Sequence, residues 1–206
     1  MKDKVSRINT EFYKNFPEIY LKPSKVNKFL KKNTNEVEKE IKNKFLNLKL
    51  DKNFVIYANG GFGRKEIFPI SDIDISIVEK NKPKGFKNLE EFISFLWDQG
   101  YKIGHSVRTI SDIKKISKSD LKEFTSYLTR RPIVSTNEMD KKINYALSTL
   151  WTKNNFYNAK YIEQQQRHGQ FFSTAFNLEP DLKESPGTLR DFQSALWILQ
   201  HCFDLK

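Results

Sequence analysis

The chain has 206 residues, 14% of them aromatic and 30% charged, and its formal net charge is +11. This length and aromatic content allow a buried core and exclude a globally disordered chain. The lack of a long apolar run or signal peptide and the single cysteine, Cys202, predict a cytoplasmic protein with no membrane association and no intramolecular disulfide.

The first predicted elements are a helix and a buried strand. Apolar residues recur at three- and four-residue steps over residues 23–45, which predicts an amphipathic helix with Ser24 as a candidate N-cap. Residues 54–58 form a short apolar run that ends at Asn59, Gly60 and Gly61. This pattern indicates a strand followed by a tight glycine turn.

A second strand is predicted over residues 71–78, where polar and apolar residues alternate. Because side chains alternate across a strand, Asp72, Asp74 and Ser76 should share one face, with isoleucines on the other. The two carboxylates are therefore expected to point the same way.

The rest of the chain predicts one more strand among helices. A capping box at residues 88–91 should open a helix that ends at Gly100, and residues 101–109 should form a strand. Helical patterns follow over residues 110–116 and 120–131, with Pro132 interrupting the second. We expect an α/β (α+β) fold with a small mixed sheet, and then helical segments broken at residues 177–187. The expected domains are an N-terminal helical extension (1–50), a catalytic domain (51–140) and the start of a helical domain (141–206).

Two glycines followed by paired aspartates suit chemistry on a nucleoside triphosphate. Magnesium prefers oxygen ligands and commonly takes one or two carboxylates, which Asp72 and Asp74 would supply. Backbone N–H groups beside Gly60 and Gly61 could approach phosphate oxygens closely, and Arg64 adds a cation. A plain turn and two solvated aspartates are the alternative interpretation, but the array from Gly60 to Asp74 is more specific than a lone Asp-x-Asp.

This array resembles a known family. The glycine pair with its downstream Asp-x-Asp is similar to the polymerase-β-type nucleotidyltransferase superfamily, and the longer array resembles the bacterial protein-PII uridylyltransferases. Residues 104–109, 163–168, 177–183 and 189–191 resemble later stretches of that family. The resemblance implies a polymerase-β-like domain followed by a helical segment that is incomplete relative to the family.

The resemblance also implies an activity: UMP is transferred from UTP to a tyrosine hydroxyl of the nitrogen-signalling protein PII, and pyrophosphate is released. It assigns Mg²⁺, in a two-metal site, to Asp72 and Asp74 as catalytic and metal-binding residues. The predicted nucleotide-binding residues are Gly60, Gly61, Gly63, Arg64, Ser71, Arg108 and Arg190.

Several assignments have alternatives. Arg190 lies where a helix N-terminus could face phosphate, but the same stretch could be a structural loop between helices. His105 could pack in the core or contact phosphate. The superfamily often has a third carboxylate on a later strand. Residues 101–109 contain none, so His105 or Ser106 could line the site, or a more distant acid such as Asp120 or Glu123 could serve.

Two further functions remain open. The same scaffold could adenylylate a protein or add nucleotides to RNA, which the positive charge mildly favours. We expect no nucleic-acid partner, however, because the lysines are scattered among Asn and Ile and indicate solvated faces. The other alternative is a truncated, non-catalytic binding or regulatory module.

Overall fold

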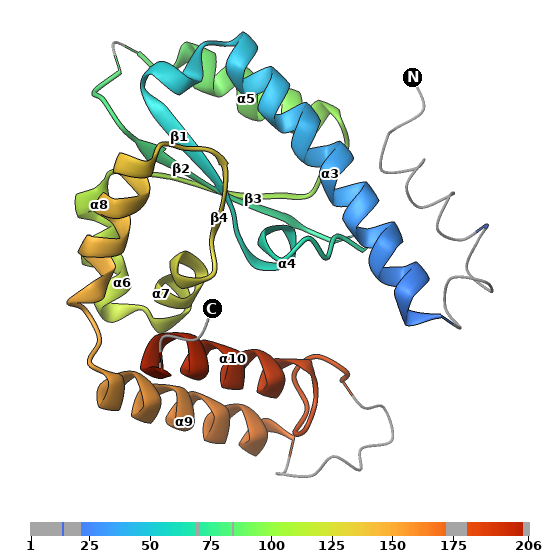
Figure 1. Ribbon diagram of the computed structural model, residues 1–206, viewed down its shortest axis with the longest axis vertical. Helices are drawn as coiled ribbons and strands as arrows, with labels where there is room; N and C mark the ends of the chain where they lie inside the picture. The colour runs from blue at the N-terminus through green and yellow to red at the C-terminus, as the bar shows by residue number, and fades with distance from the viewer. Residues whose placement is uncertain (1–13, 15–21, 69–70, 84, 172–180, 204–206) are drawn as a thin grey trace. The chain divides into compact units, whose positions relative to one another are not determined.

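The computed structural model describes residues 14, 22–68, 71–83, 85–171 and 181–203 (Figure 1). The chain divides into two compact units, one of Met1–Ile113 with Thr129–Asn144 and one of Lys114–Leu128 with Tyr145–Lys206. The domain boundaries expected at residues 50 and 140 remain predictions. The fold class is confirmed, because the first unit holds a small mixed sheet with helices and the second is helical among its described residues.

The sheet of the first unit has four strands in the order β3-β2-β1-β4. Strand β1 (Phe54–Ala58) is antiparallel to β2 (Ile73–Glu79) and to β4 (Arg131–Val134), and β2 is parallel to β3 (Ile103–Arg108). The three strands predicted from the sequence are therefore confirmed. Between β1 and β2, the predicted glycine turn forms one short helix, α4 (Gly60–Gly63).

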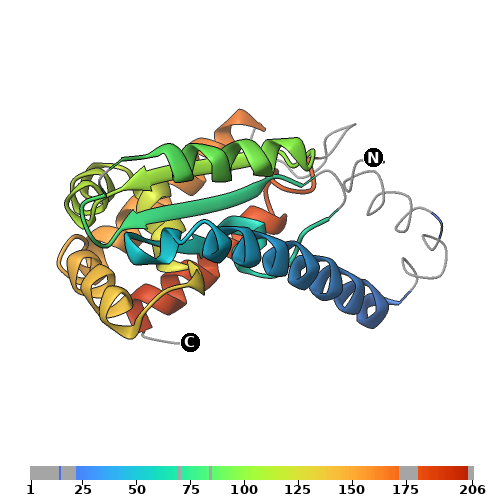
Figure 2. The same cartoon turned by 90° about the horizontal axis from the view of Figure 1, so that it is seen from above.

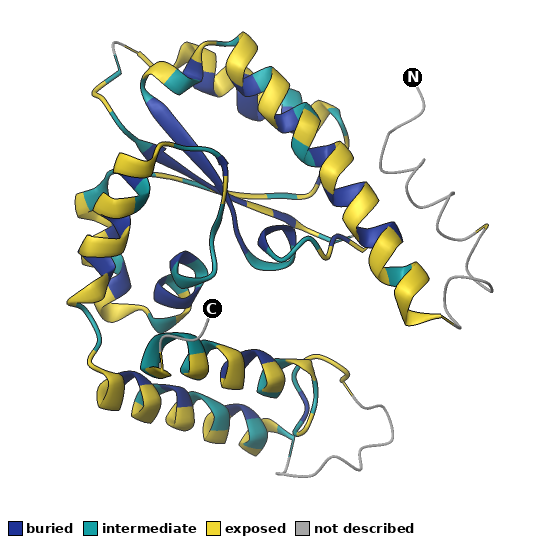
Figure 3. Cartoon of the chain, in the orientation of Figure 1, coloured by how far each residue is buried: buried dark blue, intermediate teal, exposed yellow. Residues whose placement is uncertain are grey.

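Two helices, α3 (Pro23–Asn47) and α5 (Lys87–Asp98), cover one face of the sheet (Figures 1 and 2). The isoleucines of β2 are buried there, as the alternation predicted. Figure 3 shows the matching buried stripe along α3, with its other side exposed. The core beneath these helices includes Val37, Ile41, Phe45, Phe54, Ile56, Ile73, Ile75, Ile77, Phe92 and Leu96. The aspartates of β2 therefore lie on the opposite face of the sheet, which α3 and α5 do not cover.

Two of the predicted helix caps are wrong. Helix α3 begins two residues earlier than a Ser24 cap requires: Lys22 is the N-cap, without a side-chain bond, and Pro23 occupies the first helical position, which suits its fixed φ. In α5, Asn88 does not cap the helix but donates its side-chain N–H to the Leu48 carbonyl at 2.9 Å. Gly100 does end α5, with φ of 77° and its N–H bonded to Trp97 O.

Strand β4 was not expected, because residues 120–131 carry a helical pattern. The helix α7 (Leu121–Leu128) ends earlier, and Arg131 begins a strand instead. Pro132 fits this position because β4 is an edge strand, where a residue without an N–H is tolerated. The sequence around Pro132 thus marks a change of element rather than an interruption of one helix.

The second unit is built from helices. The unit boundary passes through α6 (Ile110–Ser119) and α8 (Asn137–Ser148), while α9 (Lys153–Gln170) and α10 (Leu189–Phe203) lie wholly within the second unit and pack side by side (Figure 1). His201 packs here against Phe124 and Phe156, with ring centroids 5.2 and 4.6 Å apart. Part of the expected break at residues 177–187 lies outside the described residues, and 181–188 form turns.

Among the described residues, no helix is both long and apolar enough to cross a bilayer. The cytoplasmic location remains a prediction.

Candidate active site

The face of the sheet opposite α3 and α5 carries the predicted carboxylates. Asp74 pairs in register with Gly104, and Ser76 pairs with Ser106 on the neighbouring strand β3. Asp72 directly precedes β2 and alternates onto the same face. Both aspartates are exposed, whereas the isoleucines between and beyond them are buried. The alternation in the sequence therefore correctly predicted that the two acids share one face.

The Asp74 carboxylate lies against two glycines. A side-chain carbon added at Gly60 would stand 2.9 Å from Asp74 Oδ2, and one added at Gly104 would overlap Asp74 Oδ1. Gly60 also has a φ of 53°, in the left-handed region that favours glycine. Glycine at both positions therefore leaves room for the carboxylate between the end of β1 and the start of β3.

The turn α4 is closed by backbone hydrogen bonds. The N–H groups of Arg64 and Glu66 donate to the carbonyls of Gly60 and Gly61 at 3.2 and 2.8 Å. Gly63 fits tightly, because an added carbon would lie 2.9 Å from the Ala58 carbonyl. One added at Gly61 would make only an ordinary contact of 3.5 Å with the Glu66 carbonyl. The structure thus brings Gly60, Gly61 and Gly63 together beside Asp74, with Gly61 the least constrained.

Two of the predicted phosphate ligands have other partners in this structure. Arg64 Nε donates to Glu66 Oε2 at 2.8 Å in an ion pair that is largely exposed. Ser71 Oγ accepts a hydrogen bond from the N–H of Phe68 at 3.2 Å, which shapes the turn before β2. An exposed ion pair of this kind contributes little stability, so Arg64 would exchange its carboxylate for a phosphate at low cost.

A row of polar side chains crosses the same face behind Asp74. Asn59 is buried and donates its side-chain N–H to Ser76 Oγ, and Ser106 Oγ lies 3.5 Å from Ser76 Oγ. Tyr57 lies farther along this face and donates its hydroxyl to Asp140 Oδ1 at 2.6 Å. Burial, and then the bond to Asp140, raise the pKa of Tyr57. The phenol therefore stays protonated and acts as a donor.

Strand β3 places Arg108 and His105 on opposite faces of the sheet. Arg108 alternates with Gly104 and Ser106, so it ends β3 on the carboxylate face. His105 pairs with Ile75 and lies on the other face, where its ring meets Trp97 of α5 with centroids 6.2 Å apart. His105 is exposed, so the interpretation that it packs in the core is wrong, and its ring lies on the face away from the acids. Ser106 lies on the side of the acids.

Arg190 belongs to the second unit and is engaged there. Its guanidinium donates to Glu184 Oε1 at 2.9 Å and to Gln193 Oε1 at 2.7 Å. The neighbouring Asp191 accepts hydrogen bonds from the side chains of Gln164, Arg167 and His168 on α9 and from the N–H of Gly187. Burial opposes ionisation, but these hydrogen bonds hold the pKa of Asp191 below its usual range. Within this unit, the Leu-Arg-Asp stretch ties α10 to α9.

The donor set on the first unit fits a magnesium ion. Two exposed carboxylates share a strand face, and among the described residues no group of three or more His, Cys, Asp or Glu side chains gathers as a metal site. A cation held here would complete its shell with water and phosphate oxygens, as Mg²⁺ commonly does. Asp120, a candidate third acid from the sequence, stays a prediction. It lies in the second unit and accepts hydrogen bonds from the N–H groups of Lys122 and Glu123 at the start of α7.

Two residues near the site were missed by the sequence reasoning. Gly104 was noted only as part of a family stretch, although a glycine inside a strand often marks a close approach by another group. Arg131 was assigned to a helix, but it donates to the carbonyls of Gly63 and Phe62 at the end of α4, at 2.9 and 3.2 Å. No local pattern indicates this contact, because 68 and 69 residues separate the partners.

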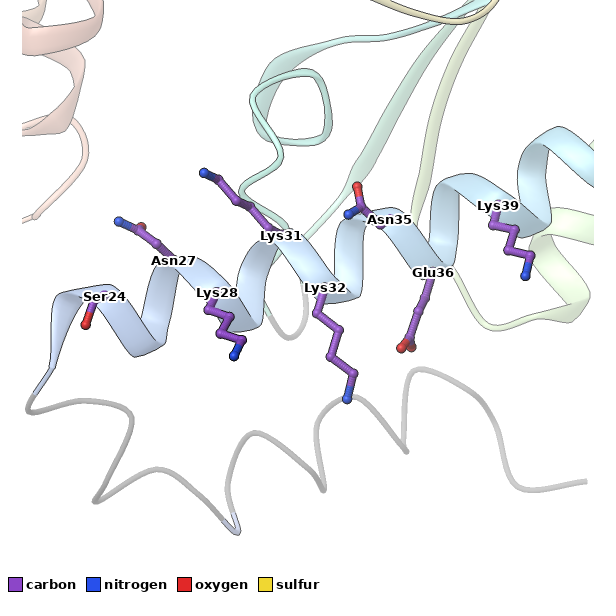
Figure 4. Close-up of a pocket in the computed structure, with 8 residues that line it drawn as sticks. All are labelled: Ser24, Asn27, Lys28, Lys31, Lys32, Asn35, Glu36 and Lys39. Carbon is purple, nitrogen blue, oxygen red and sulfur yellow. The ribbon is translucent and has the colours of Figure 1, made fainter.

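A separate groove runs along α3. Figure 4 shows its lining: Lys31 and Asn27 point to one side of the helix, while Lys28, Lys32 and Glu36 point to the other. These side chains diverge rather than converge on one ligand. The groove is therefore a weaker candidate for a nucleotide site than the carboxylate face.

Comparisons with known proteins find sequence relatives of one kind. A family model described as GlnD PII-uridylyltransferase matches residues 155–206. A bifunctional uridylyltransferase/uridylyl-removing enzyme of Haemophilus influenzae (strain PittEE) is 38% identical over 155 residues, which cover 71% of this chain and 17% of that enzyme. Its counterparts in Vibrio campbellii (strain ATCC BAA-1116) and Hydrogenovibrio crunogenus (strain DSM 25203 / XCL-2) are 36% and 37% identical, covering 73% and 72% of this chain.

The chain spans only 17–18% of the length of these relatives. Among solved structures, a toxin-antitoxin with AMP-PNP matches with 15% identity and a TM-score of 0.36, covering 64% of this chain and 98% of that one. A likeness this low supports no inference about fold or function.

Proposed function

Because the chain carries a nucleotidyltransferase region of the GlnD PII-uridylyltransferase type, we propose that it transfers UMP from UTP to a tyrosine hydroxyl of a PII signalling protein. The tyrosine oxygen forms a bond to the α-phosphorus, the bond from that phosphorus to the bridging oxygen breaks so that pyrophosphate leaves, and the tyrosine proton passes to solvent. The observation that supports this proposal most directly is that the Asp74 carboxylate lies against Gly60 and Gly104, on the same strand face as the exposed Asp72.

In the proposed complex, Asp72 and Asp74 hold Mg²⁺. When bound, the ion neutralises triphosphate charge and favours the ionised form of the attacking hydroxyl. The N–H groups of the α4 turn and the guanidinium of Arg64 bind the phosphates, and Arg108 lies on the same face to add a second cation. Ser71 orders the turn that leads into Asp72.

Arg190 has a positioning role in this proposal, in place of the phosphate contact expected from the sequence. Its bonds to Glu184 and Gln193, and those of Asp191 to α9, fix the start of α10. Such a fixed helix pair would form part of the helical region that the family model matches at residues 155–206.

The test is to incubate the chain with Mg²⁺ and each α-labelled nucleoside triphosphate, together with a purified PII protein or with RNA. Label transferred from UTP to PII, and lost when the acceptor tyrosine is changed to Phe, would support the proposal. Transfer from ATP to protein, or from any triphosphate to RNA, would favour the other reactions of this scaffold. A folded chain that binds no triphosphate would refute the proposal and favour the non-catalytic module.

A further inference from the structure

The guanidinium of Arg131 holds the far end of the glycine turn. Arg131 begins β4 and pairs in register with Ala58, the last residue of β1. Its Nε donates to the Gly63 carbonyl at 2.9 Å, and a second nitrogen donates to the Phe62 carbonyl at 3.2 Å. These carbonyls lie in the last residues of α4, where a helix leaves its C=O groups without intrahelical partners. The fork of one arginine therefore bonds two of them, although the Phe62 carbonyl also accepts from the N–H of Lys65 at 3.2 Å.

A third nitrogen of the same guanidinium forms an ion pair with a glutamate of α3. Arg131 Nη1 lies 2.7 Å from Glu38 Oε2, and the two side chains are only 23% and 22% exposed. The guanidinium carbon also lies 5.9 Å from the centroid of the Phe62 ring. The contact with Glu38 is an ion pair and not an aligned hydrogen bond, because Glu38 Oε2 has no hydrogen-bond partner among the described residues. The directional bonds of the guanidinium are the two to the α4 carbonyls. The negative charge of Glu38 thus attracts the guanidinium that bonds the carbonyls of α4.

The turn α4 depends on contacts with other elements for its stability. It has four residues, too few for a helix to be stable by itself. On one side Gly63 packs against the backbone, since an added carbon would lie 2.9 Å from the Ala58 carbonyl and 3.4 Å from the Thr129 carbonyl. At its start Gly60 lies against the Asp74 carboxylate. A shift of the Gly63 end would therefore change the space between the turn and the metal-binding acid.

We propose that Arg131 is a positioning residue for triphosphate binding, which acts through the carbonyls of Phe62 and Gly63 and is oriented by Glu38. This inference rests on the proposed function, because it takes α4 as the turn that binds phosphate. Arg131 touches no reacting atom in this scheme. It sets where the N–H groups of α4 and the Asp74 carboxylate stand relative to each other.

The decisive variant is Arg131→Lys, which keeps the charge but replaces the planar fork by a single ammonium that cannot bond both carbonyls and Glu38 in the same geometry. We expect UTP affinity, measured by calorimetry with Mg²⁺ and without acceptor, to fall about tenfold or more. In turnover assays the KM for UTP should rise while the KM for the acceptor protein stays unchanged. Glu38→Gln should act in the same direction but less, because the fork remains.

The matched control is Glu91→Gln. It removes the charge of another ion pair of α3, in which Lys44 Nζ lies 2.8 Å from Glu91 Oε1 of α5; both residues are distant in sequence from α4. We expect this variant to bind UTP within about twofold of the unchanged chain, as is usual for an exposed pair.

Hydrogen exchange gives a readout that does not depend on nucleotide. The amides of Arg64 and Glu66, bonded to the carbonyls of Gly60 and Gly61, should lose protection in Arg131→Lys while the core strands keep theirs. Unchanged exchange in the turn and unchanged UTP affinity would overturn the inference. A uniform loss of protection over the whole unit would also overturn the inference, because it would show that Arg131 stabilises the whole unit and does not position α4 in particular. If Arg131→Lys does not fold, the same two measurements on Glu38→Gln decide. Failure of the unchanged chain to bind any triphosphate would instead refute the proposed function.

Discussion

Asp72 and Asp74 are both exposed on one strand face, and removing one charge from either should stop the chemistry without unfolding the strand. We predict that Asp72→Asn or Asp74→Asn lowers transfer by more than about a hundredfold, because each removes part of the charge that holds the metal. The free energy of unfolding should change by no more than about 1 kcal/mol, since Asn has nearly the same shape.

Glu79→Gln is the control, because Glu79 ends the same strand at its far end. Its transfer rate should match that of the unchanged chain. Transfer within tenfold of the unchanged rate in both aspartate variants, with Mg²⁺ still required, would remove these residues from the metal site.

Gly60 and Gly61 are adjacent but should respond differently to substitution. Gly61→Val should weaken triphosphate binding more than folding, because an added carbon at Gly61 meets only an ordinary 3.5 Å contact, whereas a branched side chain would occupy the phosphate approach. Gly60→Ala should cost about 1–2 kcal/mol of stability, because φ is 53° there and the new carbon would crowd Asp74.

Calorimetry with UTP and denaturant unfolding on each variant would separate the two effects. Gly85→Val is the matched control, since an added carbon at Gly85 has no neighbour within 4 Å. Normal UTP binding by Gly61→Val would mean that the turn has a structural role alone.

At the residue scale, the sequence predicted which face the two aspartates share better than it predicted the residues that surround them. Alternation of side chains is a local rule, so Asp72 and Asp74 could be assigned to one face from residues 71–78 alone. The contact of Asp74 with Gly104 depends on the parallel register of β2 with β3, and that register is a long-range property. The same holds for the bond between Asn59 and Ser76.

Among the elements, the helix pair α9 and α10 is joined by one carboxylate. Hydrogen bonds from Gln164, Gly187 and His168 lower the pKa of Asp191 despite its burial, and Arg167 also donates to it. A carboxyl whose pKa is lower in the folded state stabilises the fold above its unfolded pKa, about 3.9, and loses that contribution as the pH falls through the folded value. The stabilisation is therefore present at neutral pH and lost in acid.

We predict that Asp191→Asn lowers the free energy of unfolding by roughly 2–4 kcal/mol at pH 7, because Arg167 is left without its charge partner at a largely buried site. The variant should approach the unchanged chain as the pH drops below about 4. Unfolding midpoints measured from pH 3 to pH 8 would check this.

Asp181→Asn is the comparison, since the pKa of Asp181 is also lowered, by backbone N–H groups of Glu184 and Lys183, but its side chain is exposed. Its pH profile should differ less from that of the unchanged chain. Parallel profiles for Asp191→Asn and the unchanged chain would show that the cluster does not stabilise the helix pair.

Periodicity predicted helices α3, α5, α6 and α7 and three of the strands, but it did not predict β4 or most of α8. Residues 120–131 have helical spacing, and the four residues Arg131–Val134 are too short for alternation to be recognised. What makes them a strand is pairing with β1, whose residues lie far away in the sequence. The capping residues were misjudged for a related reason, since Asn88 finds a tertiary acceptor at Leu48.

For the molecule as a whole, the formal net charge of +11 must be reconciled with the proposal of a site for one small anion. Four lysines line the groove along α3, namely Lys28, Lys31, Lys32 and Lys39. Their side chains diverge (Figure 4), which suits loose contact with a polyanion rather than a fitted site. Nucleic-acid binding and triphosphate binding should therefore depend on different parts of the chain.

We predict that RNA or DNA binds weakly and that its affinity falls about tenfold per phosphate contact for each tenfold rise in salt, because such binding releases counterions. Triphosphate binding with Mg²⁺ should persist from low to physiological ionic strength, since metal bridging and backbone donors in a confined site are screened less than surface lysines. Parallel titrations with UTP and with RNA at both salt concentrations measure this. Replacing the four α3 lysines by Gln should weaken RNA binding alone, and Asp72→Asn should weaken Mg²⁺-dependent UTP binding alone. Tight, sequence-selective RNA binding that survives at the higher salt would place RNA nucleotidyl transfer ahead of uridylyl transfer to PII.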